Sequence, residues 1–192
     1  MSMDMTLTEK AIEFAVKAHA GAKRKGKKDR PYILHPLEAM LIVSNITNDE
    51  EVIAAAVLHD TIEDAKVEKE ELAIQFGTRV ADLVAAESEN KRDGQDEKDT
   101  WLIRKQEALE ELAASGREAK LICLGDKLSN LRETAKDHAV IGDVMWENFN
   151  QKDKNLQYWY YSSIYEILKN EFGDIAEICE YSQLLAEIFG EK

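Results

Sequence analysis

The spacing of apolar residues along the chain is typical of a helical protein. Through most of the sequence, apolar side chains recur every three or four residues, which is the period of an amphipathic α-helix. A strand-rich fold needs many turns, in which Gly and Pro are favoured, but the chain has only nine Gly and two Pro residues. The helices are expected near residues 7–22, 36–44, 50–60, 68–76, 79–87, 101–116, 117–136, 156–170 and 174–190.

Capping residues set the expected ends of several of these helices. Thr6 and Glu9 have the spacing of a capping box. Pro36 at a first helical position makes His35 the expected N-cap of the second helix. Thr100 is the expected cap of the helix that follows it. His35 would then lie at a helix edge, where a side chain can be aimed at a cavity.

One polar segment interrupts the helical pattern. Residues 88–99 contain no apolar side chain, so we expect an exposed, mobile loop there. We interpret this loop as a lid over a site rather than as a domain boundary. The chain of 192 residues is long enough for one well-filled core and too short for two large catalytic domains. Residues 1–192 are therefore expected to form a single domain.

Composition and charge exclude several classes of protein. Apolar residues make up 44% of the chain and charged residues 33%, the balance of a soluble globular protein. There is no run of about eighteen apolar residues and no signal peptide, so we expect a cytoplasmic protein without a membrane partner. A formal net charge of −13 argues against a nucleic-acid surface, which requires positive charge.

A compact basic segment contrasts with this acidic background. Seven cationic residues lie between Lys17 and Arg30. Such a segment can bind a small polyphosphate without attracting a duplex. The alternative is a solvated basic loop, which composition alone would favour.

Two further groups of residues are more typical of packing than of chemistry. Cys123 and Cys179 stand singly in apolar helical patterns, so we interpret both as buried core thiols rather than as a disulfide or a zinc site. The aromatic residues at 158–161 are expected to pack the C-terminal helices rather than to stack on bases, because aromatic stripes at helical spacing usually fill cores.

The strongest chemical signal lies at residues 54–64. A small-residue apolar segment leads there into one His and three carboxylates. In a helix over 50–60, Asp60 lies on the stripe of Ile53 and Val57, so its carboxylate points at the core. An inward carboxylate requires a compensating cation or a strong donor, and the neighbouring His59 favours a metal ion.

Other parts of the chain supply further ligands for such an ion. Asp126 is a second carboxylate in apolar surroundings, and with His35, His59 and Asp60 it completes a set of two His and two carboxylates. This mixed set suits Mn²⁺ or Fe²⁺ at least as well as Zn²⁺. His19 also faces inward, but a lone inward His is more often a core residue than a ligand.

Glu63 and Asp64 follow the His-Asp pair by one helical turn. If the helix persists, both carboxylates border the same pocket as His59 and Asp60. The alternative is a solvated acidic helix end. We favour the pocket, because like charges beside a buried His-Asp pair would be unfavourable without a metal ion.

Four motifs occur in order between about residues 7 and 135. They are His19-x-Gly21-x-x-Arg24-Lys25, Pro31-Tyr32-Ile33-x-His35-Pro36, His59-Asp60-x-x-Glu63-Asp64 and Gly125-Asp126-Lys127-Leu128-x-Asn130-x-Arg132. Together they resemble the metal-binding pattern of HD-domain phosphohydrolases, and more narrowly the RelA/SpoT-type alarmone hydrolases in their small, hydrolase-only form. Each motif alone would be a weak match, whereas all four in this order are specific.

The resemblance implies a fold and a set of site residues. The fold would be an all-α HD-domain bundle of about eight to ten helices, with helices at about 150–190 packed on the motif-bearing core. A Mn²⁺ ion would be held by four residues, Glu63 and Asp64 would orient or activate the attacking water, and a third group would bind substrate. The ligands would be His35, His59, Asp60 and Asp126; the substrate-binding residues would be Arg24, Lys25 and Lys127 on the nucleotide and Asn130 on its sugar.

The resemblance also implies an activity. We expect a metal-dependent pyrophosphohydrolase that removes the 3′-pyrophosphate of guanosine tetraphosphate or pentaphosphate, with Mn²⁺ as cofactor and Fe²⁺ or Zn²⁺ as alternatives. Ala22 and Ser129 differ from the Gln and the His or Tyr that are usual in such hydrolases, so a second hypothesis is an HD phosphohydrolase for another nucleotide. A third is a nucleotide-binding sensor without turnover. Nothing in the sequence excludes a homo-oligomer.

Overall fold

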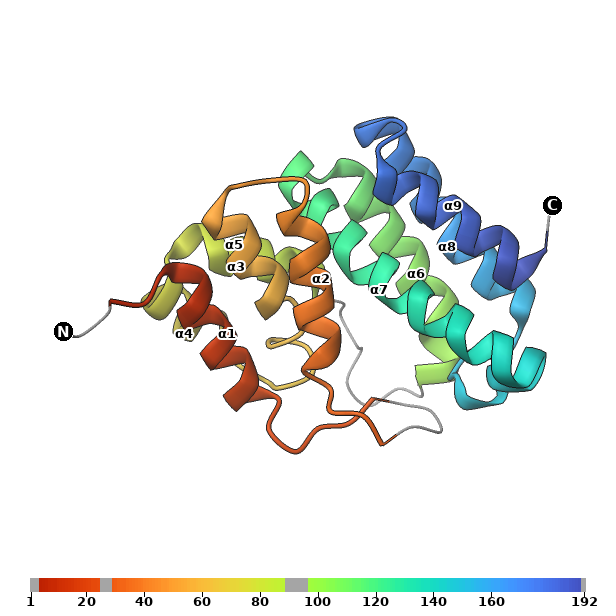
Figure 1. Ribbon diagram of the computed structural model, residues 1–192, viewed down its shortest axis with the longest axis horizontal. Helices are drawn as coiled ribbons and strands as arrows, with labels where there is room; N and C mark the ends of the chain where they lie inside the picture. Colours follow the sequence, from red (N-terminus) through yellow and green to blue (C-terminus); the bar gives the residue numbers. More distant parts are fainter. Residues whose placement is uncertain (1–3, 25–28, 89–96, 191–192) are drawn as a thin grey trace. The chain divides into compact units, whose positions relative to one another are not determined.

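The fold is all-α, as the sequence predicts. A computed structural model describes residues 4–24, 29–88 and 97–190; within these ranges it has nine α-helices, one 3-10 helix and no strand (Figure 1). The helices are α1 (Leu7–Ala18), α2 (Leu34–Ser44), α3 (Glu50–Leu58), α4 (Lys69–Phe76), α5 (Thr78–Glu87), α6 (Glu97–Ala114), α7 (Arg117–Ile141), η1 (Gly142–Asn148), α8 (Lys154–Phe172) and α9 (Ala176–Phe189).

The chain divides into two compact units. The first consists of Met1–Ser88 with Leu121–Asp126, and the second of Glu89–Lys120 with Lys127–Lys192. Helix α7 contributes residues to both. Among the described helices, none is both long and apolar enough to cross a membrane. The single domain expected from the sequence stays a prediction.

Helix α3 is the centre of the first unit. It packs against α1, α2 and α5, and the five residues 54–58 at its C-terminal end are completely buried. A helix that is apolar on all sides must be enclosed by other elements, and three consecutive Ala residues allow those elements to approach closely. The end of α3 at Leu58 is therefore held in place, and so is the start of the segment that follows it.

Asp49 fixes the opposite end of α3. Its carboxylate accepts hydrogen bonds from the backbone of Glu51 (3.0 Å) and Val52 (3.4 Å), and Arg79 of α5 donates to it at 2.8 and 3.2 Å. The hydrogen bonds from Arg79 are the main reason that the pKa of Asp49 lies below 3.8. We expect Asp49→Ala to lower the free energy of unfolding by about 1 kcal/mol, measured by urea unfolding at neutral pH.

The same carboxylate predicts a pH dependence. Because its pKa is lower in the folded chain, Asp49 stabilises the fold at neutral pH, and this contribution is lost as the pH falls below about 4. Asp49→Asn keeps a capping side chain without the charge, so its stability should lie between those of the parent and Asp49→Ala at pH 7. The difference between the parent and Asp49→Asn should shrink in acid; a constant difference would contradict the role of the charge.

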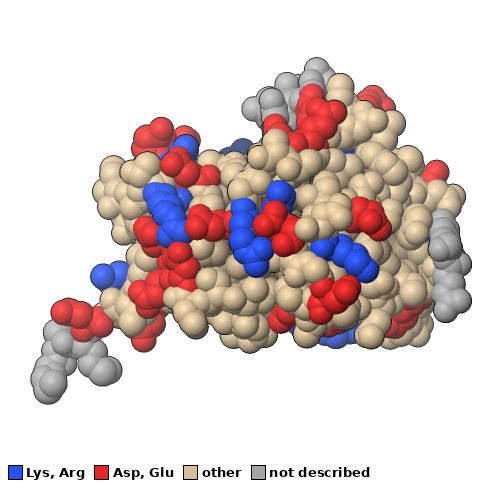
Figure 2. Space-filling model, turned by 90° about the horizontal axis from the view of Figure 1, so that it is seen from above, with Lys and Arg blue, Asp and Glu red and all other residues tan. Residues whose placement is uncertain are grey.

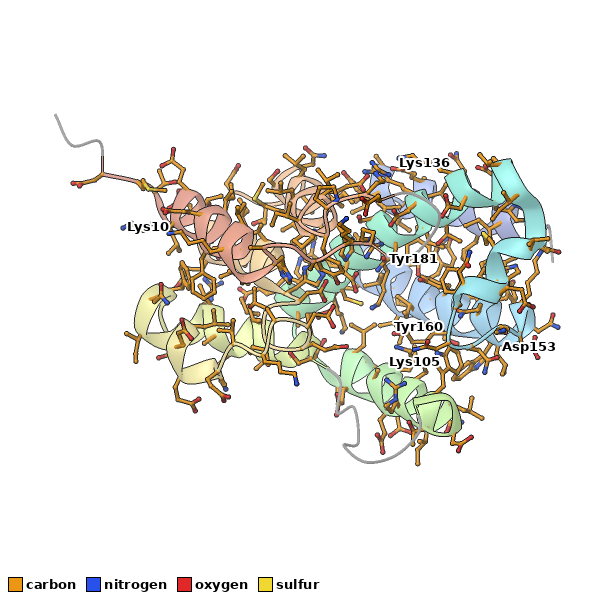
Figure 3. All side chains as sticks on the ribbon, turned by 90° about the horizontal axis from the view of Figure 1, so that it is seen from below. Lys10, Lys105, Lys136, Asp153, Tyr160 and Tyr181 are labelled. Carbon is orange, nitrogen blue, oxygen red and sulfur yellow. The ribbon has the colours of Figure 1, made fainter. Side chains whose placement is uncertain are left out.

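Aromatic side chains form much of the core of the second unit. The ring of Trp101 in α6 lies 6.0 Å from Tyr160 and 6.4 Å from Trp159 in α8, and Trp146 stacks on Phe189 at 5.4 Å. Figure 3 shows Tyr160 beside Lys105, whose Nζ lies 4.7 Å from the ring centroid. The prediction that the aromatic residues pack the C-terminal helices is confirmed.

Charges of both signs share the surface. On the face drawn in Figure 2, acidic and basic side chains lie next to one another. Within the second unit, Arg132 forms two 2.7 Å hydrogen bonds with Glu180, and Arg117 and Lys120 both pair with Glu171. Cations that are paired with carboxylates attract a nucleic-acid phosphate backbone only weakly. The surface described here therefore adds no reason to expect nucleic-acid binding.

Several helix ends differ from those predicted. Helix α1 stops at Ala18 rather than near residue 22, because the chain turns through Gly21, whose φ of +80° is left-handed. Helix α2 has Ile33, not His35, at its N-cap, so His35 lies inside the first turn. Pro36 is still tolerated there because amides of the first turn lack intrahelical partners.

Two further predictions are wrong. Thr100 is not a cap: α6 already begins at Glu97, and the buried hydroxyl of Thr100 accepts a hydrogen bond from Arg104 Nε at 3.3 Å. The preceding residues carry no apolar periodicity from which a helix could be predicted. Cys123 is buried as expected, but Cys179 is exposed on α9. The predicted lid spans residues 88–99; residues 97–99 instead begin α6, and residues 89–96 lie outside the described residues, so a lid there stays a prediction.

Candidate functional site

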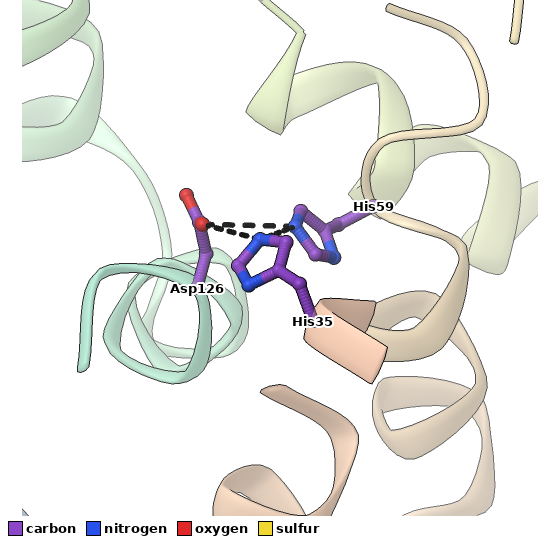
Figure 4. Close-up of side chains that lie close together, drawn as sticks. All are labelled: His35, His59 and Asp126. Carbon is purple, nitrogen blue, oxygen red and sulfur yellow. Dashed lines mark hydrogen bonds and ion pairs between the residues drawn. The ribbon is translucent and has the colours of Figure 1, made fainter. Parts of the chain in front are cut away.

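Three distant stretches of the first unit bring a His-His-Asp cluster together. His35 lies in the first turn of α2, His59 directly follows α3, and Asp126 lies on α7 (Figure 4). Asp126 Oδ1 is 3.1 Å from His35 Nε2 and 3.7 Å from His59 Nε2. The two Nε2 atoms are 3.3 Å apart. All three side chains are buried.

Asp60 adds a second carboxylate to this cluster. Its Oδ2 lies 3.0 Å from His59 Nε2 and 3.5 Å from His35 Nε2. The four residues that the sequence predicts as ligands therefore lie together, although they come from three separate parts of the chain.

A backbone hydrogen bond sets the orientation of the His59 ring. Nδ1 of His59 lies 2.8 Å from the carbonyl oxygen of Ala56, which can only accept a hydrogen bond. Neutral His59 therefore carries its proton on Nδ1, and Nε2 presents a lone pair to the cluster. This is the tautomer that a metal ligand requires.

The separations within the cluster fit a shared ion. Two ligand atoms that each lie ~2.1 Å from one ion are ~3.0 to ~3.4 Å apart, depending on the angle between them. Three of the separations that involve an Nε2 atom, at 3.0, 3.1 and 3.3 Å, fall in this range, and two, at 3.5 and 3.7 Å, are slightly longer. His35, His59 and Asp126 alone offer three ligand atoms within 4.8 Å of one another. They form a possible site for a divalent metal ion.

The electrostatics of the cluster also favour a cation. Burial alone would lower the pKa of His59, but the carboxylates of Asp60 and Asp126 outweigh burial, and the pKa lies well above its usual value. Burial would raise the pKa of Asp60, but His59 and His35 hold it well below its usual value. Asp60 thus stays ionised and attracts positive charge into the cluster.

The acidic turn after the cluster is not a helix. Residues 59–65 form a succession of turns, so the predicted continuation of the helix beyond Leu58 is wrong. The backbone amide of Asp64 nevertheless donates to the carbonyl of Asp60 at 2.9 Å, as in one turn of an α-helix. The side chains of Asp60 and Asp64 therefore remain one turn apart. Glu63 is half-buried on the same turn, and Asp64 is exposed.

Tyr32 is a site residue to which the sequence assigned no role. Its hydroxyl lies 2.7 Å from Asp60 Oδ2 and 2.8 Å from Asp64 Oδ2, so it connects a candidate ligand with a candidate catalytic carboxylate. Burial and these two carboxylates raise the pKa of Tyr32, which therefore keeps its proton at neutral pH. Only the position of Tyr32 three residues before His35 could have drawn attention to it.

His19 packs behind Tyr32. The two ring centroids are 4.9 Å apart, and His19 is buried, as the sequence predicts. Its Nε2 has no hydrogen-bond partner among the described residues. Burial is the main reason that the pKa of His19 is lowered, so the ring is neutral near pH 7. His19 thus contributes an uncharged, polar side chain next to Tyr32.

The predicted substrate-binding residues are only partly brought to this site. The guanidinium of Arg24 lies 5.6 Å from the Tyr32 ring centroid. Lys25 lies outside the described residues. Lys127 and Asn130 belong to the second unit, where Lys127 Nζ is 6.0 Å from the Tyr160 ring centroid. Binding of substrate by these four residues stays a prediction.

Comparisons with known proteins identify the family of the chain. The HD domain family model matches residues 11–149. The guanosine-3′,5′-bis(diphosphate) 3′-pyrophosphohydrolase MESH1 of Xenopus tropicalis is 38% identical over 136 residues, which cover 69% of this chain and 72% of that protein.

Solved structures show the same fold. A protein from Listeria monocytogenes EGD-e has a TM-score of 0.71 and 30% identity over 82% of this chain and 99% of its own. A metazoan ortholog of SpoT that hydrolyses ppGpp has a TM-score of 0.77 and 24% identity over 100% of both chains, a likeness that shows the fold. With its His-His-Asp cluster and its match over residues 11–149, the chain belongs to the HD-domain family.

Proposed function

We propose that the chain is a metal-dependent pyrophosphohydrolase that removes the 3′-pyrophosphate of guanosine 3′,5′-bis(diphosphate). The observation that carries this proposal is the cluster of His35, His59, Asp60 and Asp126 directly beside the carboxylate of Asp64. The similarity to MESH1, a hydrolase named for this reaction, supports the substrate.

Mn²⁺ is the proposed ion. Two imidazoles and two carboxylates form a mixed nitrogen and oxygen donor set, which suits Mn²⁺ or Fe²⁺ at least as well as Zn²⁺. A divalent cation supplies Lewis-acid polarisation of a phosphoryl oxygen and makes water a better nucleophile at neutral pH. Replacing Mn²⁺ by Fe²⁺ or Zn²⁺ in the purified protein and comparing kcat tests the preference.

Other residues of the chain are proposed to position the water and bind the nucleotide. A water oxygen attacks the phosphorus attached to the 3′ oxygen of the nucleotide, that P–O bond breaks, and the 3′ oxygen takes up a proton. Glu63 and Asp64 are proposed to orient the water and accept its proton. Arg24 and Lys25 are proposed to bind the phosphates, and Lys127 and Asn130 to bind the rest of the nucleotide.

The product of the reaction tests this proposal. Incubation of the purified protein with Mn²⁺ and guanosine 3′,5′-bis(diphosphate) should release one pyrophosphate and leave the 5′-diphosphate, both separable by ion-exchange chromatography. Addition of excess chelator should stop the reaction. Release of single phosphates, or no turnover, would contradict the assignment. A panel of other nucleotides, scored by product, then decides whether another member of this substrate class is preferred.

A further inference from the structure

We propose that Thr61 is a positioning residue that holds the acidic turn, residues 59–65, in the conformation in which Glu63 and Asp64 serve the metal site. The effect on catalysis rests on the proposed function, whereas the effect on the turn does not. Thr61 itself is expected to touch neither the ion nor the substrate, because its side chain is completely buried and bonded to the backbone of α3.

The first argument is that Thr61 anchors the start of the turn to α3. Its backbone amide and its hydroxyl both donate to the carbonyl of Leu58, at 2.9 and 2.7 Å. Leu58 is the last residue of α3 and is itself completely buried. The hydroxyl bond also fixes the rotamer of the β-branched side chain. Two hydrogen bonds to a buried carbonyl therefore set the direction in which the chain leaves residue 61.

The second argument is that Thr61 also anchors the far end of the turn. Its carbonyl accepts a hydrogen bond from the amide of Val67 at 3.1 Å, which closes a loop around the acidic residues. The chain reaches Val67 through Lys66, whose φ of +56° is a left-handed conformation that non-glycine residues adopt infrequently. Such a conformation persists where the surrounding structure holds it. Both ends of the loop thus meet at one buried residue.

The third argument is the place of Thr61 between the two functional groups. It lies between Asp60, a candidate ligand, and the candidate catalytic residues Glu63 and Asp64. The amide of Asp64 donates to the Asp60 carbonyl at 2.9 Å, and the Tyr32 hydroxyl lies 2.8 Å from Asp64 Oδ2. These contacts act within the site, whereas Thr61 orients the whole loop relative to α3. A displacement of ~1 Å can lower a rate ~100-fold, so a small rotation at Thr61 affects both carboxylates.

Two substitutions of Thr61 separate positioning from stability. Thr61→Val removes the hydroxyl, but the Leu58 carbonyl keeps the amide of residue 61, so no buried acceptor loses its only partner. We expect kcat to fall ~3- to ~30-fold, with KM and the Mn²⁺ affinity measured by calorimetry changed less than ~3-fold. Thr61→Ser keeps the hydroxyl and loses a buried methyl group. It should lower Tm by ~2 to ~4 °C and keep kcat within ~2-fold of the parent.

Ser115→Ala is the matched control. The amide and hydroxyl of Ser115 donate to the carbonyl of Leu112 at 3.2 and 2.9 Å, the same pair of bonds at the end of α6. Helix α7 begins at Arg117, so no acidic turn follows this cap. Ser115→Ala should therefore keep the kcat of the parent.

Hydrogen exchange tests the turn without turnover. In the purified protein, Thr61→Val should speed amide exchange ~3- to ~10-fold in peptides that contain residues 61–67, measured by mass spectrometry, whereas Thr61→Ser and Ser115→Ala should not. Unchanged exchange in Thr61→Val, a kcat within ~2-fold of the parent, loss of Mn²⁺ that accounts for the lower kcat, or no rescue by Thr61→Ser would overturn the inference. If exchange changes as expected but the parent does not hydrolyse the nucleotide, the proposed function fails and the positioning of the turn stands.

Discussion

Asparagine in place of Asp126 should remove the tightly bound divalent ion and lower kcat by more than about 100-fold, since loss of residues that merely support metal ligands costs about 10- to 100-fold. Asp126 is buried, and its Oδ1 faces both imidazole nitrogens, at 3.1 and 3.7 Å. The amide keeps the shape of the side chain but removes the charge that attracts a cation. Metal content after dialysis and kcat with guanosine 3′,5′-bis(diphosphate) give the two measurements.

Asp137→Asn is the matched control for this substitution. Asp137 lies on the same helix, in the second unit, and the substitution makes the same change of charge. Its metal content and kcat should equal those of the parent. If Asp126→Asn keeps a full equivalent of metal and turns over normally, Asp126 is not a ligand and the cluster must be reassigned.

Gly125→Ala should destabilise the first unit even though alanine is the better helix former. A Cβ atom at this position would lie 2.8 Å from the carbonyl oxygen of Ala39 and 2.9 Å from Val43 Cγ2, both on α2. We expect overpacking to cost about 1 to 3 kcal/mol against a gain of ~1 kcal/mol in helix propensity, for a net loss of up to about 2 kcal/mol. Each kcal/mol lowers Tm by about 2 to 4 °C in a chain of this size.

The same substitution should also impair catalysis. Gly125 precedes Asp126 on α7, and α2, which it contacts, carries His35. Separating these helices increases the distance between two candidate ligands, so metal affinity and kcat should fall along with Tm. Gly116→Ala is the control, because a Cβ atom there meets nothing within 4 Å. That variant should lose only some N-cap preference and keep the kcat of the parent.

The sequence predicted most helices and the four candidate ligands because both depend on local patterns. Apolar periodicity is a property of neighbouring residues, and it placed nearly all helices within a few residues of their observed bounds. Asp126 lies on α7 and is buried, as its apolar pattern predicted, whereas Asp60 reaches the cluster from a turn after α3 and not from the predicted helix. His35 does lie beside His59 and Asp126, but from inside α2 and not from its cap, as had been expected.

What the sequence could not predict depends on contacts between distant residues. Tyr32 reaches Asp60 and Asp64 only because the chain between residues 22 and 32 folds back on itself. The close approach of α2 to Gly125 is likewise invisible in a helix whose own pattern tolerates glycine. The start of α6 was missed because its first turn carries no apolar residue, and propensity alone sets such ends poorly.

The hydrogen bond between His59 and the carbonyl of Ala56 has a structural consequence for the helix that precedes it. The last carbonyls of a helix lack intrahelical partners, and here the His59 ring serves as a C-terminal cap of α3, together with the Thr61 hydroxyl, which donates to Leu58 at 2.7 Å. The same hydrogen bond therefore ends α3 and leaves the lone pair of His59 Nε2 directed at the cluster. Fraying of α3 would release the ring, and whatever holds the ring in place stiffens the centre of the first unit.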